Sequence, residues 1–92
     1  MSSEAFLAEA RLTAARNLTD NIRAVSASLD DGHLSVTYYM ASEPKIADEE
    51  ERETTVAELI AAFPEVQTAD AYSEEVSGEV VALRDEQIVF QR

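Results

Sequence analysis

Cysteine is absent from this 92-residue chain, and glycine and proline occur only twice each. A chain without cysteine has no disulfide, no thiolate nucleophile and no cysteine-ligated metal site, so its fold depends on packing alone, as suits a reducing cytoplasm. Two glycines are too few for a glycine-rich loop that binds nucleotide phosphates. The sequence also lacks an apolar span of about 20 residues and an N-terminal apolar run of roughly 7–15 residues. We therefore expect a cytoplasmic protein with neither a membrane helix nor a secretory signal.

Basic residues are scarce: 7 Lys and Arg stand against 19 Asp and Glu, for a formal net charge of −12. Nucleic-acid binding requires clustered basic side chains, so direct binding of nucleic acid is excluded. The imbalance is concentrated, because residues 1–42 hold 5 acids and 3 bases whereas residues 43–92 hold 14 acids and 4 bases. Concentrated like charge repels itself, so its retention suggests that the second half of the chain binds something basic.

The first half of the chain predicts a helix followed by a β-hairpin. Apolar residues recur at spacings of three and four over residues 3–19, which is typical of an amphipathic helix. Alternating residues then predict strands over 23–29 and 34–40, joined by the hairpin signal Asp31-Gly32. The predicted buried stripe of the helix consists of Phe6, Leu7, Ala10, Ala14 and Leu18.

Tyr38 and Tyr39 are adjacent on the second predicted strand. Neighbouring strand residues point to opposite faces of a sheet, so we expect one tyrosine in the core and the other exposed. An exposed tyrosine beside acidic residues is a common interface anchor.

The second half predicts a helix and further strands. After a connection over residues 41–47, acidic residues crowd the start of a helix over residues 48–63, and Pro64 ends it. Its predicted buried stripe consists of Val56, Leu59, Ile60 and Phe63. Strands are predicted over residues 66–72 and 79–84, with the polar connection 73–78 turning the chain back between them. Residues 88–90 either extend the last strand or form a short fifth one.

The element order is therefore α-β-β-α-β-β, in one domain over residues 1–92. A composition with 46% hydrophobic residues supports a globular domain, and a chain of this length can bury one core. The natural arrangement is a two-layer α+β fold, in which both helices pack on one face of a mainly antiparallel sheet.

Chemical sites find little support in the sequence. His33, the only histidine, could be grouped with Asp31 and Ser35, but all three lie at a predicted hairpin tip with nothing to hold them in place. The acidic run over residues 48–53 lacks the spacing and central glycine of a calcium-binding EF-hand loop. We expect no catalytic residue, no metal and no cofactor.

Two segments and the overall character of the chain carry a resemblance to a known class of proteins. DGHLSVTYYMASEPKIADEEE runs from the hairpin into the acidic helix, and ALRDE lies late in the chain. A short, acidic, cysteine-free α+β chain with these segments resembles the small immunity proteins that bacteria make beside a nuclease toxin, as in contact-dependent growth inhibition and colicin-like systems. The resemblance implies that the partner is the catalytic domain of a cognate toxin, bound either at its active site or at a neighbouring surface. Acidic side chains can occupy a basic nuclease cleft by standing where phosphates would lie.

The residues predicted to contact the partner come from the acidic second half. They are Glu43, Asp48, Glu49, Glu50, Glu53, Asp70, Tyr72, Glu74 and Glu75. Two other classes of function remain open. One is a homodimeric adaptor or regulatory interaction domain that pairs through a free sheet edge or face. The other is a small enzyme or ligand carrier with a pocket between sheet and helices.

Overall fold

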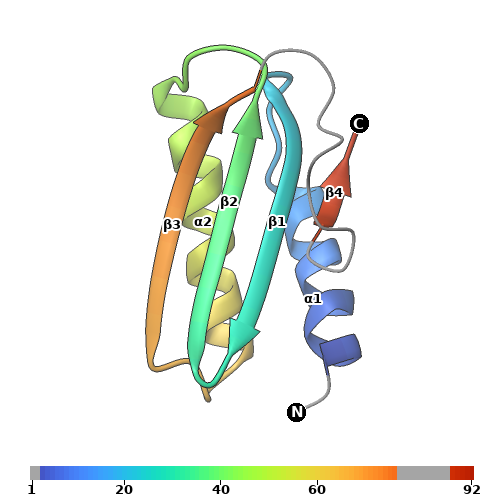
Figure 1. The fold of residues 1–92 in the computed structure, drawn as a ribbon, viewed down its shortest axis with the longest axis vertical. Helices are drawn as coiled ribbons and strands as arrows, with labels where there is room; N and C mark the ends of the chain where they lie inside the picture. Colours follow the sequence, from blue (N-terminus) through green and yellow to red (C-terminus); the bar gives the residue numbers. More distant parts are fainter. Residues whose placement is uncertain (1–2, 77–87) are drawn as a thin grey trace.

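The computed structural model describes residues 3–76 and 88–92 of the chain (Figure 1). Its elements, in order, are α1 (Ser3–Arg16), β1 (Ile22–Asp30), β2 (His33–Met40), α2 (Ile46–Ala62), β3 (Thr68–Glu75) and β4 (Ile88–Gln91). Both helices lie against the same face of a four-stranded sheet (Figure 1). The predicted α+β class and α-β-β-α-β-β order are therefore confirmed. The strand predicted over residues 79–84 lies outside the described residues. Among the described helices, none is long and apolar enough to cross a membrane.

The predicted hairpin is confirmed, and its turn explains why it forms. Asp31 and Gly32 have φ angles of 51° and 81°, which is the left-handed backbone of a two-residue type I′ turn. β1 and β2 pair antiparallel from Asp30 and His33 at the turn to Ile22 and Met40 at the far end. Side chains of β2 alternate as predicted, because Tyr38 is fully buried and Tyr39 is only half-buried.

The sheet order β3-β2-β1-β4 differs from the prediction for the third strand. We predicted that the connection 73–78 turns this strand back on itself, but β3 continues through Ser73 to Glu75 and pairs in parallel with β2. Parallel neighbours require a long crossover between them, and the segment between β2 and β3 that contains α2 supplies it. The strand also begins at Thr68 rather than at Val66. Residues 88–90 belong to a separate short strand, β4, that pairs antiparallel with β1. The sheet remains mainly antiparallel.

The core lies between the helices and the sheet. Phe6 of α1 and Phe63, which follows α2, meet with ring centroids 5.3 Å apart. The predicted stripe of α1 is confirmed in the core, although Leu7 and Leu18 are only partly buried. In α2, Ile60 was predicted to be buried but is 43% exposed, whereas Thr55 is 1% exposed. The helix is turned so that Thr55 faces Tyr38, which moves Ile60 out of the interface.

A polar network around Tyr38 crosses this core. The Tyr38 hydroxyl donates to the backbone oxygen of Asn17 at 3.0 Å and hydrogen bonds the hydroxyl of Thr55. Burial raises the pKa of Tyr38 to about 12. The hydrogen bond with Thr55 lowers this pKa, and the negative charges of Glu51 and Glu58 raise it.

Asn17 explains why α1 ends at Arg16 rather than at the predicted residue 19. Its side-chain amide donates to the backbone oxygen of Thr13 at 2.9 Å, which occupies the acceptor that the next helical turn would use. Its own backbone N–H bonds Ala14 instead, at 3.0 Å. The side chain also donates to Glu58 of α2 at 2.6 Å, so the end of α1 is tied to the second helix.

Candidate functional site

The start of α2 depends on Asp48, which lies at the third position of the helix after the capping residue Lys45. The Asp48 carboxylate accepts a hydrogen bond from the backbone N–H of Lys45 at 2.9 Å, which satisfies a donor that the helix itself leaves free. This contact starts the helix at Ile46, two residues earlier than predicted. The same carboxylate accepts from the Thr19 hydroxyl at 2.5 Å and from the Asn21 side chain at 2.8 Å.

Asp48 is therefore an internal residue. Its exposed fraction is 2%, although it was predicted to contact a partner. Burial alone would raise its pKa, but the hydrogen bonds from Thr19, Asn21 and Lys45 outweigh burial and lower the pKa below its usual value. The carboxylate connects the α1–β1 loop to α2, and it is not part of the exposed acidic surface.

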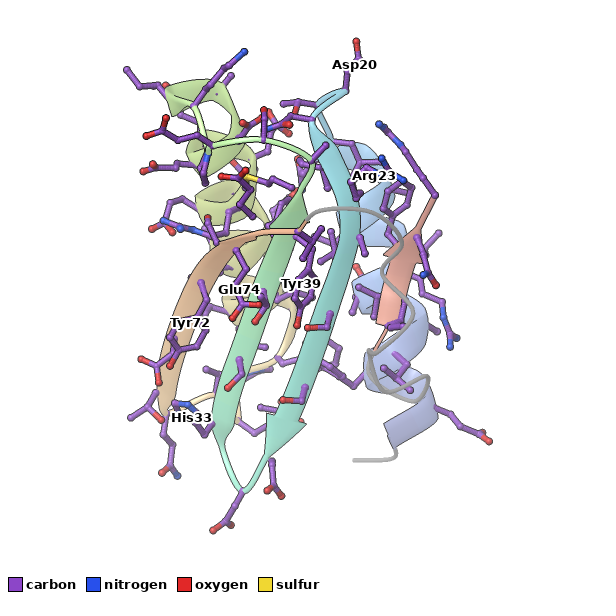
Figure 2. The ribbon with its side chains drawn as sticks, turned by 45° about the horizontal axis from the view of Figure 1, so that its top comes forward. Asp20, Arg23, His33, Tyr39, Tyr72 and Glu74 are labelled. Carbon is purple, nitrogen blue, oxygen red and sulfur yellow. The ribbon has the colours of Figure 1, made fainter. Side chains whose placement is uncertain are left out.

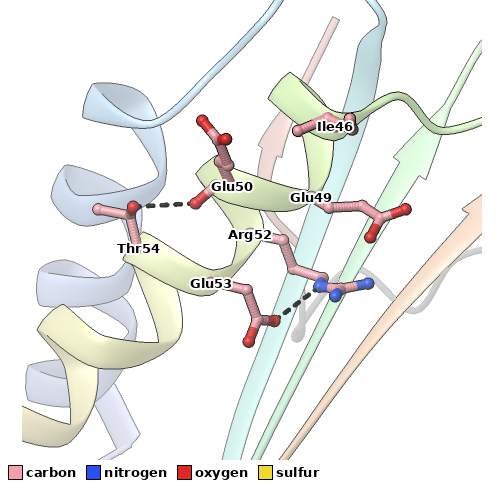
Figure 3. A pocket seen from close by; sticks show the side chains of 6 residues that line it. All are labelled: Ile46, Glu49, Glu50, Arg52, Glu53 and Thr54. Carbon is pink, nitrogen blue, oxygen red and sulfur yellow. Dashed lines mark hydrogen bonds and ion pairs between the residues drawn. The ribbon is translucent and has the colours of Figure 1, made fainter.

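The next acidic residues of α2 do face solvent. Glu49, Glu50 and Glu53 are all exposed, and Ile46 beside them is 79% exposed. Residues separated by three, four and seven positions share one face of a helix. Ile46, Glu49, Glu50 and Glu53 therefore form one continuous strip, which we call the helix surface (Figure 3). An exposed apolar side chain on the same face as these carboxylates was not anticipated from the sequence, although the spacing of Ile46 from the three acids would have placed it there.

Arg52 links this helix to the sheet. Its guanidinium donates to Glu53 at 3.0 Å and to the hydroxyl of Ser73 on β3 at 2.7 Å. The Arg52 side chain is only 17% exposed, so its charge is largely used within the protein. Sequence reasoning missed this residue because Ser73 was assigned to a loop.

The helix surface borders an open depression of about 650 Å³, lined by Ile46, Glu49, Glu50, Arg52, Glu53 and Thr54. This volume falls within the range of about 300–1,000 Å³ found for small-molecule sites. However, all six lining residues belong to one helix and the depression opens widely to solvent, so it cannot enclose a small ligand. It is better described as part of an exposed surface.

A second group of predicted residues lies on the open face, meaning the side of the sheet opposite the helices (Figure 2). Asp70, Tyr72 and Glu74 alternate along β3 and stand beside Ser35, Thr37 and Tyr39 of β2 in the parallel register. Tyr72 is 50% exposed. The negative charge of Asp70 raises the pKa of the Tyr72 hydroxyl above its usual value.

His33 also lies on the open face, at the start of β2. Its Nδ1 is 2.5 Å from the Thr68 hydroxyl, and its Nε2 is 3.1 Å from a carboxylate oxygen of Asp70. The sequence suggested Asp31 and Ser35 as companions, whereas the observed contacts come from β3. They were not predictable because they depend on the parallel placement of that strand.

The predicted contact residues therefore fall into separate places. The helix surface belongs to the helix layer and the open face to the opposite side of the sheet, and the hydrogen bond from Arg52 to Ser73 ties α2 to the helix-facing side of β3. Glu43 is exposed in the connection before α2, and Glu75 is exposed at the end of β3, in register with Met40. Among residues 3–76 and 88–92, no group of three or more His, Cys, Asp or Glu could hold a metal ion.

Comparison with known families identifies the family of this chain. The family model described as MafI2 immunity protein matches residues 10–92, which include the helix surface and the open face. No curated protein matches the chain. A family match over this much of the chain shows an immunity function and, with it, a cognate toxin as the partner. The chain therefore belongs to the MafI2 immunity protein family.

Proposed function

We propose that this chain neutralises a nuclease toxin by binding its basic active-site cleft, or a surface beside that cleft, through exposed carboxylates. It acts as a stoichiometric inhibitor in the cytoplasm, where such a toxin meets nucleic acid, and it catalyses no reaction. The proposed contacts are the exposed members of the predicted set. They are Glu43, Glu49, Glu50, Glu53, Asp70, Tyr72, Glu74 and Glu75.

The observation that carries the proposal is the helix surface. Three exposed carboxylates lie on the same helix face as the exposed side chain of Ile46. Of these three, only Glu53 has a guanidinium within ion-pair distance among the described residues. Interfaces with this composition combine an apolar anchor with charges that steer the partner. A cleft that binds phosphates carries Lys and Arg side chains, and these can bind carboxylates by the same charge-assisted hydrogen bonds.

The test is the association rate with the toxin encoded beside this chain. Replacing Glu49, Glu50 and Glu53 by Gln removes three charges while keeping side-chain size and helix propensity. Electrostatic steering can raise association rates from roughly 10⁵–10⁶ toward 10⁸–10⁹ M⁻¹s⁻¹ at low salt. We therefore expect the triple variant to associate at least about tenfold more slowly at low salt, with the difference shrinking as ionic strength rises.

A matched control distinguishes the effect of charges on this surface from the effect of the net charge of the whole protein. The control variant removes three charges from the first half of the chain, through Glu4→Gln, Glu9→Gln and Asp20→Asn. It should associate at nearly the wild-type rate and protect cells from the toxin. Equal slowing in both triple variants would contradict the proposed surface, and failure of the wild-type protein to bind or protect against any adjacent toxin would contradict the proposed function.

A further inference from the structure

β3 forms one edge of the sheet, and no strand among the described residues pairs with its outer side. Two hydrogen bonds show how its backbone is oriented: the backbone N–H of Thr68 donates to the backbone oxygen of Gly32 at 3.2 Å, and that of Val76 donates to the backbone oxygen of Met40 at 2.8 Å. Both groups belong to even-numbered residues and point toward β2. Backbone groups alternate in direction along a strand, so the even-numbered residues of β3 pair with β2.

The odd-numbered residues of β3 consequently direct their N–H and C=O groups outward. These residues are Ala69, Ala71, Ser73 and Glu75. Their backbone groups form a row of donors and acceptors at the free edge, of the kind that can pair with another extended chain.

This edge lacks most of the features that protect edge strands. β3 is eight residues long, contains no proline or lysine, and keeps a continuous register with β2 without a bulge. Its protection comes from negative charge alone, carried by Asp70, Glu74 and Glu75. Protection by one sign of charge is selective, because it repels acidic strands and attracts basic ones.

A second copy of this chain is a poor occupant of the edge. Symmetric antiparallel pairing requires outward-facing residues to lie opposite one another, and the register that pairs all four of them is centred on Tyr72. That register places Asp70 of each copy directly opposite Glu74 of the other. Like charges placed directly opposite one another across strands are destabilising, so this register, which would make the most backbone hydrogen bonds between two copies, is disfavoured.

We propose that the free edge of β3 pairs with an extended basic segment of the cognate toxin, which adds to the sheet as a strand beside Ala69–Glu75. This inference rests on the proposed function for the identity of the partner. Side chains of the added strand alternate between faces, so Lys or Arg at every second position lies beside Asp70 and Glu74 on the open face. The same cations lie near the exposed ring of Tyr72, whose face attracts positive charge.

Amide hydrogen exchange of the complex provides the decisive pattern. In the free protein, the N–H groups of Asp70, Tyr72 and Glu74 already bond β2, whereas those of Ala69, Ala71 and Ser73 do not. Binding of the catalytic domain of the toxin should slow the odd-numbered amides at least about tenfold, since a new hydrogen bond must open before exchange. A stable complex in which the odd-numbered amides exchange at unchanged rates would overturn the strand proposal and leave the immunity function intact.

A peptide tests the edge without the toxin. The probe is an eight-residue peptide of alternating Lys and Val, and its matched control alternates Glu and Val. We expect the Lys peptide to slow the same odd-numbered amides and the Glu peptide to leave them unchanged. Equal effects of the two peptides, or none from either, would contradict the proposal even if the toxin binds elsewhere. A wild-type protein that sediments as a dimer with slowed odd-numbered amides would instead assign the edge to a second copy.

Backbone and charge variants complete the test. Ala71→Pro removes one outward N–H without removing a bond to β2, and should weaken binding of the Lys peptide about two- to twelvefold. Ala71→Ser keeps the N–H and should bind like the wild-type protein. Asp70→Asn with Glu74→Gln should weaken binding about two- to thirtyfold through lost cross-strand charge pairs. Unchanged exchange of the Tyr72 amide confirms that each variant still folds, and wild-type affinity in folded Ala71→Pro would refute the edge pairing.

Discussion

Replacing Asp48 by Ala provides the sharpest test of the structure. The charge pattern and the fold predict opposite effects of this substitution on the free energy of unfolding. Removing one acid from a crowded run relieves repulsion and should slightly stabilise the protein. In the fold, however, the carboxylate accepts hydrogen bonds from Thr19, Asn21 and the backbone of Lys45. We therefore expect the substitution to lower the free energy of unfolding.

The magnitude follows from these three contacts. A hydrogen bond to a charged group contributes about 1.5–3 kcal/mol, but the side chains of Thr19 and Asn21 are half-buried and can turn to water after the substitution. The N–H of Lys45 at the helix start then accounts for most of the loss, together with part of the other two bonds. We expect a loss of about 2–4 kcal/mol, measured by urea unfolding at pH 7, and a fall in Tm of roughly 8–30 °C.

Asp48→Asn is the matched control, since the amide oxygen can still accept from Lys45 and Asn21. It should cost less than Asp48→Ala and should isolate the contribution of the charge. Because the folded-state pKa of Asp48 lies below its ordinary value of 3.8, the ionised carboxylate stabilises the fold fully above that pH and loses this effect as pH falls through the folded pKa. The stability difference between wild type and Asp48→Asn should therefore be largest near neutral pH and shrink on acidification below 3.8.

The reasoning is refuted if Asp48→Ala is as stable as the wild type within about 0.5 kcal/mol, the range typical of surface substitutions. A difference between wild type and Asp48→Asn that grows on acidification would contradict the direction of the pKa shift.

Three further substitutions test the packing. Leu59→Ala should lower the free energy of unfolding by about 2–5 kcal/mol, whereas Ile60→Ala should lower it much less because Ile60 is 43% exposed. Equal losses for the two variants in urea unfolding would contradict the orientation of α2. Gly32→Ala should destabilise by about 1 kcal/mol or more, since Gly32 has a φ of 81° and an added Cβ would lie 3.3 Å from Gln67; an unchanged Tm would contradict the turn. Tyr38→Phe should cost about 1–3 kcal/mol by leaving the buried oxygen of Asn17 without its donor, and a neutral effect on unfolding would show that this network contributes little.

The sequence anticipated only part of the candidate surface. Asp48 and Glu49 are adjacent acids at the start of one helix, yet one is buried and the other is exposed. Adjacent helical residues point about 100° apart, so an acidic run over residues 48–53 extends around the whole helix and must turn some residue inward, but the run does not indicate which one. The choice depends on Thr19 and Asn21, which lie 29 and 27 positions away in the chain.

The placement of β3 was unpredictable for a related reason. Its alternating residues indicate a strand, but a strand pattern alone does not specify a neighbour or a direction. Pairing with β2 in parallel brings Asp70 to His33 and leaves the outer edge of β3 unpaired among the described residues. Both outcomes follow from α2 crossing over the sheet, which is a property of the whole fold.

Local sequence by itself determined the features that depend on near neighbours. The Asp31-Gly32 turn, the element order and the excess of acid in the second half all follow from residue type and short spacing. Tertiary structure alone decided which carboxylates are available to a partner and which sheet edge is open. Burial and hydrogen bonding depend on residues that come together only after folding, and their free energies are set by those distant partners rather than by the local sequence.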